Sequence, residues 1–173
     1  GLRLGLGVAL VLIMLIGGKV TPSFTRNWLV KRGDTVLPTP PMQRYDKAVI
    51  VVSAATLLAW VARPDAGLVG AALLIIAGLH SVRLWRWQGV RALAEPLVWV
   101  LHAGYAFVPL GALAVGVSIV FPATISTAAA LHVWTAGAIG LMTLGVMTRA
   151  SLGYSGRALH AGAGTTCLYA AVI

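Results

Sequence analysis

The sequence has 173 residues, of which 59% are hydrophobic and 10% are charged. Ordinary soluble domains carry about 25% charged residues, so this composition excludes a soluble globular domain. The net charge of +9 is compatible with nucleic-acid binding, but the basic residues fall between hydrophobic segments and form no single basic face. The chain is therefore interpreted as an integral membrane protein that has the lipid bilayer, and no nucleic acid, as its partner.

The apolar segments are long enough to be membrane spans, because roughly 20 helical residues cross the hydrocarbon of a bilayer. No cleavage site of small residues precedes Lys19, so the first segment is interpreted as a span and not as a signal peptide. The fold class is all-α: a polytopic transmembrane helix bundle with about six spans. In chain order the predicted helices cover residues 2–18, 47–62, 66–85, 97–121, 127–148 and 159 onward.

The domain organisation follows from the same pattern. Residues 1–173 form a single transmembrane bundle, which we expect to be a fragment of a longer chain because it starts without Met and stops inside an apolar run. Four prolines, which break helices, lie between the first two predicted spans, among many basic residues. We predict a basic, Pro-containing loop at about residues 20–45. The prolines are Pro22, Pro38, Pro40 and Pro41.

The basic residues also predict the orientation in the membrane. They gather between the first and second, third and fourth, and fifth and sixth predicted helices, whereas the alternate loops hold only Arg63 beside Asp65, or no charge at all in residues 121–127. Basic loops face the cytoplasm in membrane proteins. We therefore expect the loop at 20–45 to be cytoplasmic and the turn at 121–127 to be external.

Two histidines lie in a stretch with no Asp, Glu, Lys or Arg, residues 97–148: His102 and His132. Polar side chains within a bilayer face the protein interior, and neutral imidazole ligates haem iron, copper or zinc. Both are candidate metal ligands, with a purely structural hydrogen-bonding role as the alternative. Thr135, Ala136, Ile139 and Thr143 recur along one stripe with His132, and this stripe is expected to face the protein. The small residues of this fifth helix predict a place near the bundle centre.

The candidate ligands are predicted to lie at different depths in the membrane. His80 falls near the cytoplasmic end of the third helix and His102 near the cytoplasmic start of the fourth, so the two are predicted to be close, and His80 joins the metal candidates. His132 lies roughly 15 Å away in depth, too far to share a metal with His102. Tyr105, one turn after His102, is a candidate cofactor-binding neighbour through hydrogen bonding or redox chemistry.

Hydrolytic catalysis is not expected, because no nucleophile, base and orienting group occur together. The four carboxylates fall in predicted loops or at helix ends, and any activity would be redox chemistry at a haem or copper centre. The carboxylates are Asp34, Asp46, Asp65 and Glu95.

Several motifs in order resemble the NnrS family. They are GGKVTPSFTRN at residues 17–27, LHAGY at 101–105, ALH at 130–132, GAIGLMT at 137–143 and MTRASLGYSGR at 147–157. The resemblance implies a polytopic protein of the bacterial inner membrane that is involved in the response or resistance to nitric oxide and contains haem and copper. It also implies a longer full chain. Further metal ligands would then come from the absent helices or from a homo-oligomer. If those ligands are essential, this fragment alone holds no cofactor.

The resemblance extends the set of candidate site residues. Arg149 and Arg157 would pair with haem propionates or with lipid phosphates at the cytoplasmic rim, although a role in setting topology explains them equally well. Two departures from the family pattern stand out. Tyr154 replaces a frequent His, which removes a possible ligand, and Lys19 replaces the usual Arg, which exchanges a forked donor for a point charge.

Two other functions compete with the haem or metal protein. The first is a transporter or half-transporter whose fourth helix, kinked at Pro109, and Gly-rich fifth helix would line a substrate path. No internal repeat and no mid-membrane carboxylate support it. The second is a structural membrane subunit without a cofactor.

Overall fold

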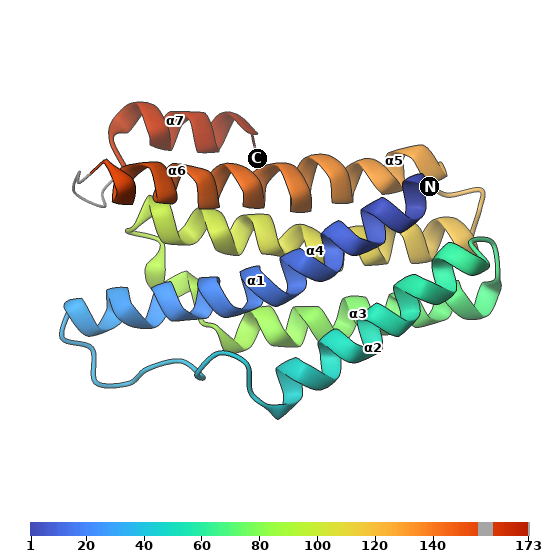
Figure 1. Ribbon diagram of the computed structural model, residues 1–173, viewed down its shortest axis with the longest axis horizontal. Helices are drawn as coiled ribbons and strands as arrows, with labels where there is room; N and C mark the ends of the chain where they lie inside the picture. The colour runs from blue at the N-terminus through green and yellow to red at the C-terminus, as the bar shows by residue number, and fades with distance from the viewer. Residues whose placement is uncertain (156–160, 173) are drawn as a thin grey trace.

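A computed structural model describes residues 1–155 and 161–172 as a bundle of helices that run side by side along one axis (Figure 1). No strand occurs among these residues. The prediction of an all-α transmembrane bundle is confirmed: five helices are long and apolar enough to cross a membrane, and a sixth, shorter helix is also apolar. They are α1 (Leu2–Lys31), α2 (Arg44–Ala62), α3 (Gly67–Arg86), α4 (Pro96–Val120), the continuous helix Thr127–Tyr154, and α7 (Ala163–Val172).

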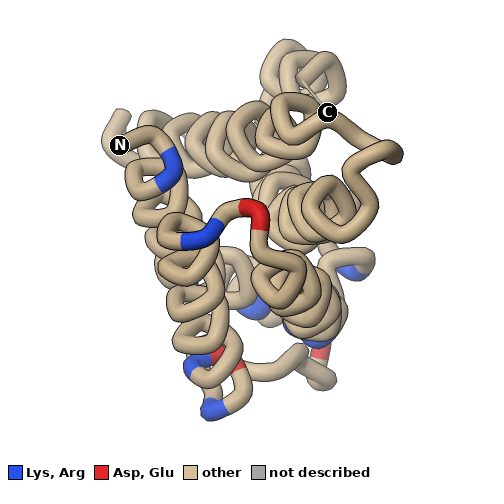
Figure 2. The backbone as a smooth tube through the Cα atoms, turned by 90° about the vertical axis from the view of Figure 1, so that its right-hand side faces the viewer, with Lys and Arg blue, Asp and Glu red and all other residues tan. Residues whose placement is uncertain are grey.

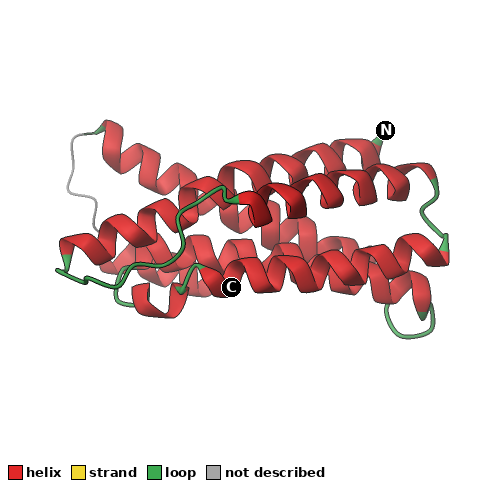
Figure 3. Cartoon of the chain, turned by 90° about the horizontal axis from the view of Figure 1, so that it is seen from below, coloured by secondary structure: helices red, strands yellow, loops and turns green. Residues whose placement is uncertain are grey.

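The first helix is longer than the sequence predicts. It continues through the buried Pro22 to Lys31, so a loop beginning near residue 20 is wrong at its start, and the connection to α2 spans residues 32–43 (Figure 3). Proline removes one helical hydrogen bond and its ring crowds the carbonyl four residues earlier. In membrane helices this is tolerated because neighbouring elements support the backbone. Here the residue four positions earlier is Gly18, and α4 packs against this helix.

The last long helix changes its winding in the middle. It runs as α5 (Thr127–His132), the π-helical segment η2 (Val133–Leu141) and α6 (Met142–Tyr154). Trp134 in the π segment is fully buried and donates its indole N–H to the Val108 carbonyl on α4 at 3.1 Å. A side chain at Gly111 would collide with this indole. The wider π-helical turns are often found at functional sites, and here they hold the indole against α4.

The core is centred on α4, which packs against α1, α3, α5, η2 and α6. The expectation that the fifth helix occupies the centre is therefore wrong, and Figure 1 shows α4 lying between that helix and α3. Helix α4 also continues through Pro109 without a break. The short 3₁₀ helix η1 (Gly89–Ala92) joins α3 to α4 and lies against α1 and α4.

The outer faces of the helices carry apolar side chains, as lipid contact requires. Most of the backbone in Figure 2 carries no charged residue. Because water would not favour such a surface, the exposed side chains agree with a bilayer environment. The exposed large residues include Leu12, Val51, Leu58, Ile75, Trp85, Leu110 and Leu113.

Candidate functional site

A buried ion pair lies at the base of the candidate site, between α2 and α3. The Arg83 Nε donates to Asp46 Oδ1 at 2.8 Å, and the two side chains are 0% and 3% exposed. The second carboxylate oxygen of Asp46 accepts the Gln43 backbone N–H at 2.9 Å and so closes the capping box of α2. Asp46 is predicted from the sequence to lie in a loop or at a helix end, and the pair with Arg83 is not predicted. The available signal was the spacing of Arg83 three residues after His80, which puts both on one helix face.

Arg83 also connects α3 to two further helices, α1 and α4. One terminal nitrogen, Nη1, donates to the Tyr105 hydroxyl oxygen at 2.6 Å and to the Met14 carbonyl at 3.0 Å. The guanidinium has room because Gly18 of α1 lies against it, and any Cβ at that position would collide with it. The buried charge is therefore held by partners from α1, α2 and α4, which is what a charge inside a membrane protein requires.

His80 completes the same network. Its Nε2 lies 2.9 Å from the Ser53 hydroxyl and its Nδ1 lies 2.9 Å from the Tyr105 hydroxyl. Ser53 gives its proton to the Val49 carbonyl at 2.8 Å, so the His80 Nε2–H donates to Ser53, and Tyr105 donates to Nδ1. Both nitrogens are engaged, so His80 offers no open lone pair to a metal in this arrangement.

His102 differs from His80 because one of its ring nitrogens has no partner. Its Nε2 lies 2.8 Å from Thr25 Oγ1, and Thr25 gives its own proton to the Thr21 carbonyl at 2.9 Å. The Nε2–H must therefore donate to Thr25, which leaves the lone pair on Nδ1. This Nδ1 is buried and has no hydrogen-bond partner among the described residues. Buried polar atoms without partners are rare and call for an explanation.

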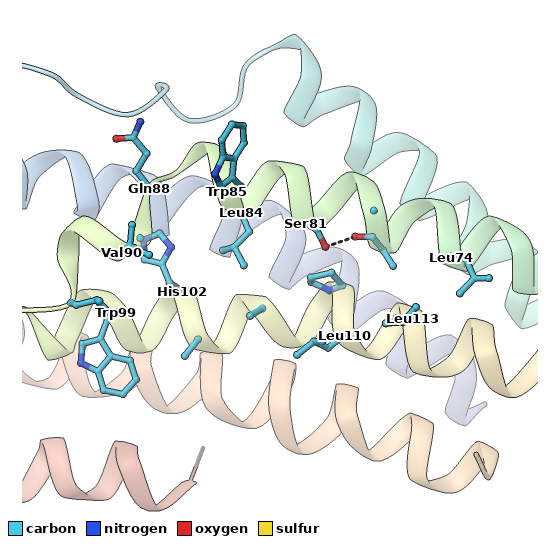
Figure 4. A pocket seen from close by; sticks show the side chains of 17 residues that line it. Leu74, Ser81, Leu84, Trp85, Gln88, Val90, Trp99, His102, Leu110 and Leu113 are labelled. Carbon is cyan, nitrogen blue, oxygen red and sulfur yellow. Dashed lines mark hydrogen bonds between the residues drawn. The ribbon is translucent and has the colours of Figure 1, made fainter. Parts of the chain in front are cut away.

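The open nitrogen lies beside an apolar groove between α3 and α4. The groove has a volume of about 890 Å³, and Figure 4 shows the side chains along it. Gly89 of η1 lines the groove and lies so close to the His102 Nδ1 edge that a Cβ there would sit 2.5 Å from the nitrogen. Ser81 and Gln88 are polar residues of a lining that is otherwise mainly apolar. His102 is only 8% exposed, so a ligand in the groove would meet a nearly dry imidazole.

The two histidines lie on either side of one aromatic pair, as their predicted proximity requires. Trp87, which is 1% exposed, lies with its ring centre 4.6 Å from that of Tyr105 and 6.2 Å from that of His102. Tyr105 in turn lies 5.8 Å from His80, ring centre to ring centre. Tyr105 is hydrogen-bonded to His80 and packs against Trp87, and its role beside a cofactor stays a prediction.

His132 has a different environment. It is exposed, and so are Thr135, Ala136 and Thr143 of its stripe, so the expectation that this face points into the protein is wrong for the described residues. The buried face of this helix is the one that carries Trp134. Because Trp134 contacts the Val108 carbonyl, six residues beyond His102 on α4, His132 lies at least roughly 9 Å along the bundle from His102. A role as ligand stays a prediction for His132.

The two arginine candidates lie elsewhere. Arg149 lines a separate cleft between α1 and α6, and Arg157 falls outside the described residues, as does His160. Neither prediction of a propionate contact is tested by this geometry. Among residues 1–155 and 161–172, no three His, Cys, Asp or Glu side chains gather to hold a metal ion, so His102 offers a single coordinating atom.

The fold and these residues define a class: a polytopic membrane protein with a buried charged network and an imidazole that opens on a groove. The family model described as NnrS protein matches residues 1–173, and the chain belongs to the NnrS family. Neither the curated proteins nor the solved structures contain a match to the chain.

Proposed function

We propose that this chain is the membrane-embedded part of a protein of the nitric-oxide response, and that His102 supplies a ligand atom to a haem iron or a copper ion. Membership of the NnrS family supports the link to nitric oxide. The buried, unpartnered Nδ1 of His102 carries the assignment of the ligand. Neutral imidazole with a free lone pair is the form that binds metals.

The surroundings of His102 favour this role over simple packing. A histidine with a purely structural role would have a hydrogen-bond partner at each ring nitrogen, as His80 has in Ser53 and Tyr105. Thr25 instead fixes the Nε2–H tautomer of His102 and leaves Nδ1 open. An outer hydrogen bond of this kind orients the ligand ring and raises its basicity.

The groove supplies a route for the substrate. Nitric oxide is small and apolar, so it dissolves in the hydrocarbon of a membrane and needs no aqueous channel. The groove that reaches His102 is bordered by Leu110 and Leu113, both exposed on the outer face of α4. A metal held there would supply a coordination position for nitric oxide, and the Trp87 ring packs edge-on near the imidazole at 6.2 Å between ring centres.

The remaining ligands lie outside the groove. Because His102 provides one coordinating atom, we propose that other helices of a longer chain or a second copy complete the metal site. Members of the family are expected in the bacterial inner membrane, and we propose that the end bearing the basic residues faces the cytoplasm.

The buried carboxylate does not favour a transporter. Asp46 is the buried acidic residue of the described core, and both its oxygens are engaged, one by Arg83 and one by the Gln43 N–H. A coupling carboxylate must exchange its partners during transport, whereas this one closes a helix cap and neutralises a structural arginine.

The test is the iron and copper content of the purified full-length protein, together with its visible spectrum. We expect bound metal or a haem Soret band in the wild type, its loss in His102→Ala, and its retention in His132→Ala. A wild type free of metal and haem contradicts the proposal, and so does a His102→Ala variant that retains both in full.

A further inference from the structure

A second cleft lies between α1 and α6, away from His102. It has a volume of about 820 Å³, and the α1 residues that line it recur along one face. Its lining is divided by chemistry into an apolar part and a short polar part. The apolar part consists of Val20, Phe24, Val30, Val146 and Ala150, and the polar part contains Asn27, Lys31 and Arg149.

The position of the cleft along α1 places it at the membrane surface. Helix α1 has 30 residues and is therefore about 45 Å long, whereas the hydrocarbon is about 30 Å thick. The first 18 residues contain one charge, Arg3, and the next charge is Lys19. The last turns of α1, with Asn27 and Lys31, therefore extend into the headgroup region. Tyr154, which is 94% exposed, borders the cleft as aromatic residues do at membrane interfaces.

The polar part of the cleft carries donors without acceptors. The Arg149 guanidinium carbon lies 3.7 Å from the ring centre of Phe24, which also lines the cleft. The guanidinium makes no hydrogen bond or ion pair with any described residue, and the same holds for the Lys31 amine and the Asn27 amide. Glu95 is near enough for its charge to act on Arg149 but lies outside the cleft lining. The lining itself therefore holds two cations and an amide with no carboxylate, and its charge would be complemented by a bound anion.

From this geometry we infer that the cleft binds one anionic phospholipid, with its phosphate between Lys31 and Arg149 and an acyl chain along the apolar wall. Arginine and lysine are the usual phosphate donors, and Asn27 adds a neutral one. The described lining of the cleft contains no His, Cys or Met. Apart from the exposed Tyr154, the lining therefore offers no common axial ligand to a haem, which favours the lipid over a haem propionate. The inference does not depend on the proposed function of His102.

Native mass spectrometry of the purified full-length protein tests this site. The protein is loaded from mixed micelles that contain phosphatidylglycerol or phosphatidylcholine, and retained lipid is counted. We expect one phosphatidylglycerol per chain to be retained in preference to phosphatidylcholine. Lys31→Gln should lower this retention about fivefold, since each basic residue near a lipid surface contributes about that factor. The double variant with Arg149→Gln should lower it further.

Lys47→Gln is the matched control, because Lys47 is exposed near the start of α2 and lines no part of this cleft. It should retain phosphatidylglycerol like the wild type. Lys31 is exposed at the end of α1, so Lys31→Gln should fold even if the double variant does not. Equal retention of the two lipids by the wild type, or unchanged retention in Lys31→Gln, overturns the inference. Displacement of the lipid by millimolar inorganic phosphate would identify a site for free phosphate and also overturn it.

Discussion

The Arg83 guanidinium and the Asp46 carboxylate form a 2.8 Å ion pair with side chains that are 0% and 3% exposed. This pair joins α2 to α3 within the bundle, and Arg83 extends it to α1 and α4 through the Met14 carbonyl and the Tyr105 hydroxyl. A buried charge that loses its partner is strongly destabilising, even where the intact pair contributes little to stability.

Arg83→Gln is therefore expected to destabilise the protein by about 3–5 kcal/mol, because Asp46 stays buried with one oxygen unpaired. The measurement is reversible unfolding in detergent micelles, followed by circular dichroism. The matched control is Arg91→Gln. Arg91 pairs with Asp34 at 3.5 Å with side chains about one third exposed, and exposed pairs contribute about 0–1 kcal/mol. Equal losses in the two variants would show that burial of the Arg83 pair has no energetic consequence.

Gly18→Ala should destabilise the bundle, although alanine is the better helix former. A Cβ at this position collides with the Arg83 guanidinium, and the rigid network around Arg83 leaves little room for relaxation. We expect a loss of about 1–3 kcal/mol, as for other overpacked cores. Gly5→Ala on the same helix meets nothing within 4 Å and should be neutral or stabilising by up to about 1 kcal/mol. Thermal unfolding of both variants in one detergent measures the difference, and a stabilised Gly18→Ala would contradict the packing described.

Tyr105 and His80 should be energetically coupled. Tyr105→Phe removes the donor to His80 Nδ1 and the acceptor of Arg83, and His80→Gln removes the other half of the contact. In a double-mutant cycle we expect a coupling energy of about 0.5–3 kcal/mol. Combining Tyr105→Phe with Ser118→Ala is the control, since among the described residues the Ser118 hydroxyl bonds only to the Val115 carbonyl. That pair should be additive within about 0.5 kcal/mol, and an additive Tyr105 and His80 pair would argue against the hydrogen bond.

The turn at residues 121–126 should be external. It contains no charged residue, whereas the connection at 32–43 is flanked by the basic residues Lys31, Arg44 and Lys47, and basic flanks stay in the cytoplasm. A reporter active only outside the cytoplasm is expected to be active when fused in the uncharged turn and inactive when fused in the connection at 32–43. The reverse pattern would invert the topology.

The sequence alone predicts the helices better than the site. Apolar length is a strong signal, so the spans of α2, α3 and α4 agree with their predicted positions within a few residues. The end of α1 was missed because Pro22 usually stops a helix and here does not. The proximity of His80 and His102 followed from their depths, since rise per residue is a local property.

The partners of these histidines could not be predicted in the same way. Which face of a helix is buried depends on its neighbours, and uniformly apolar helices carry little periodic signal. His132 was assigned to the interior for that reason, and it is exposed. Arginine rarely lies inside a membrane bundle, so the sequence gives no reason to place Arg83 there. Its partner Asp46 is 37 residues away, and no local pattern connects the two.

The open lone pair of His102 is the central claim, and Gly89→Ala tests it most directly. The added Cβ would lie 2.5 Å from Nδ1, closer than atoms can approach, so it would cover that nitrogen or displace the imidazole without removing the histidine. Gly78→Ala lines the same groove with nothing within 4 Å of the added carbon, so it serves as the control. We predict that purified Gly89→Ala loses the bound metal or haem that the wild type and Gly78→Ala retain. Full retention in a folded Gly89→Ala protein would contradict coordination by His102 Nδ1.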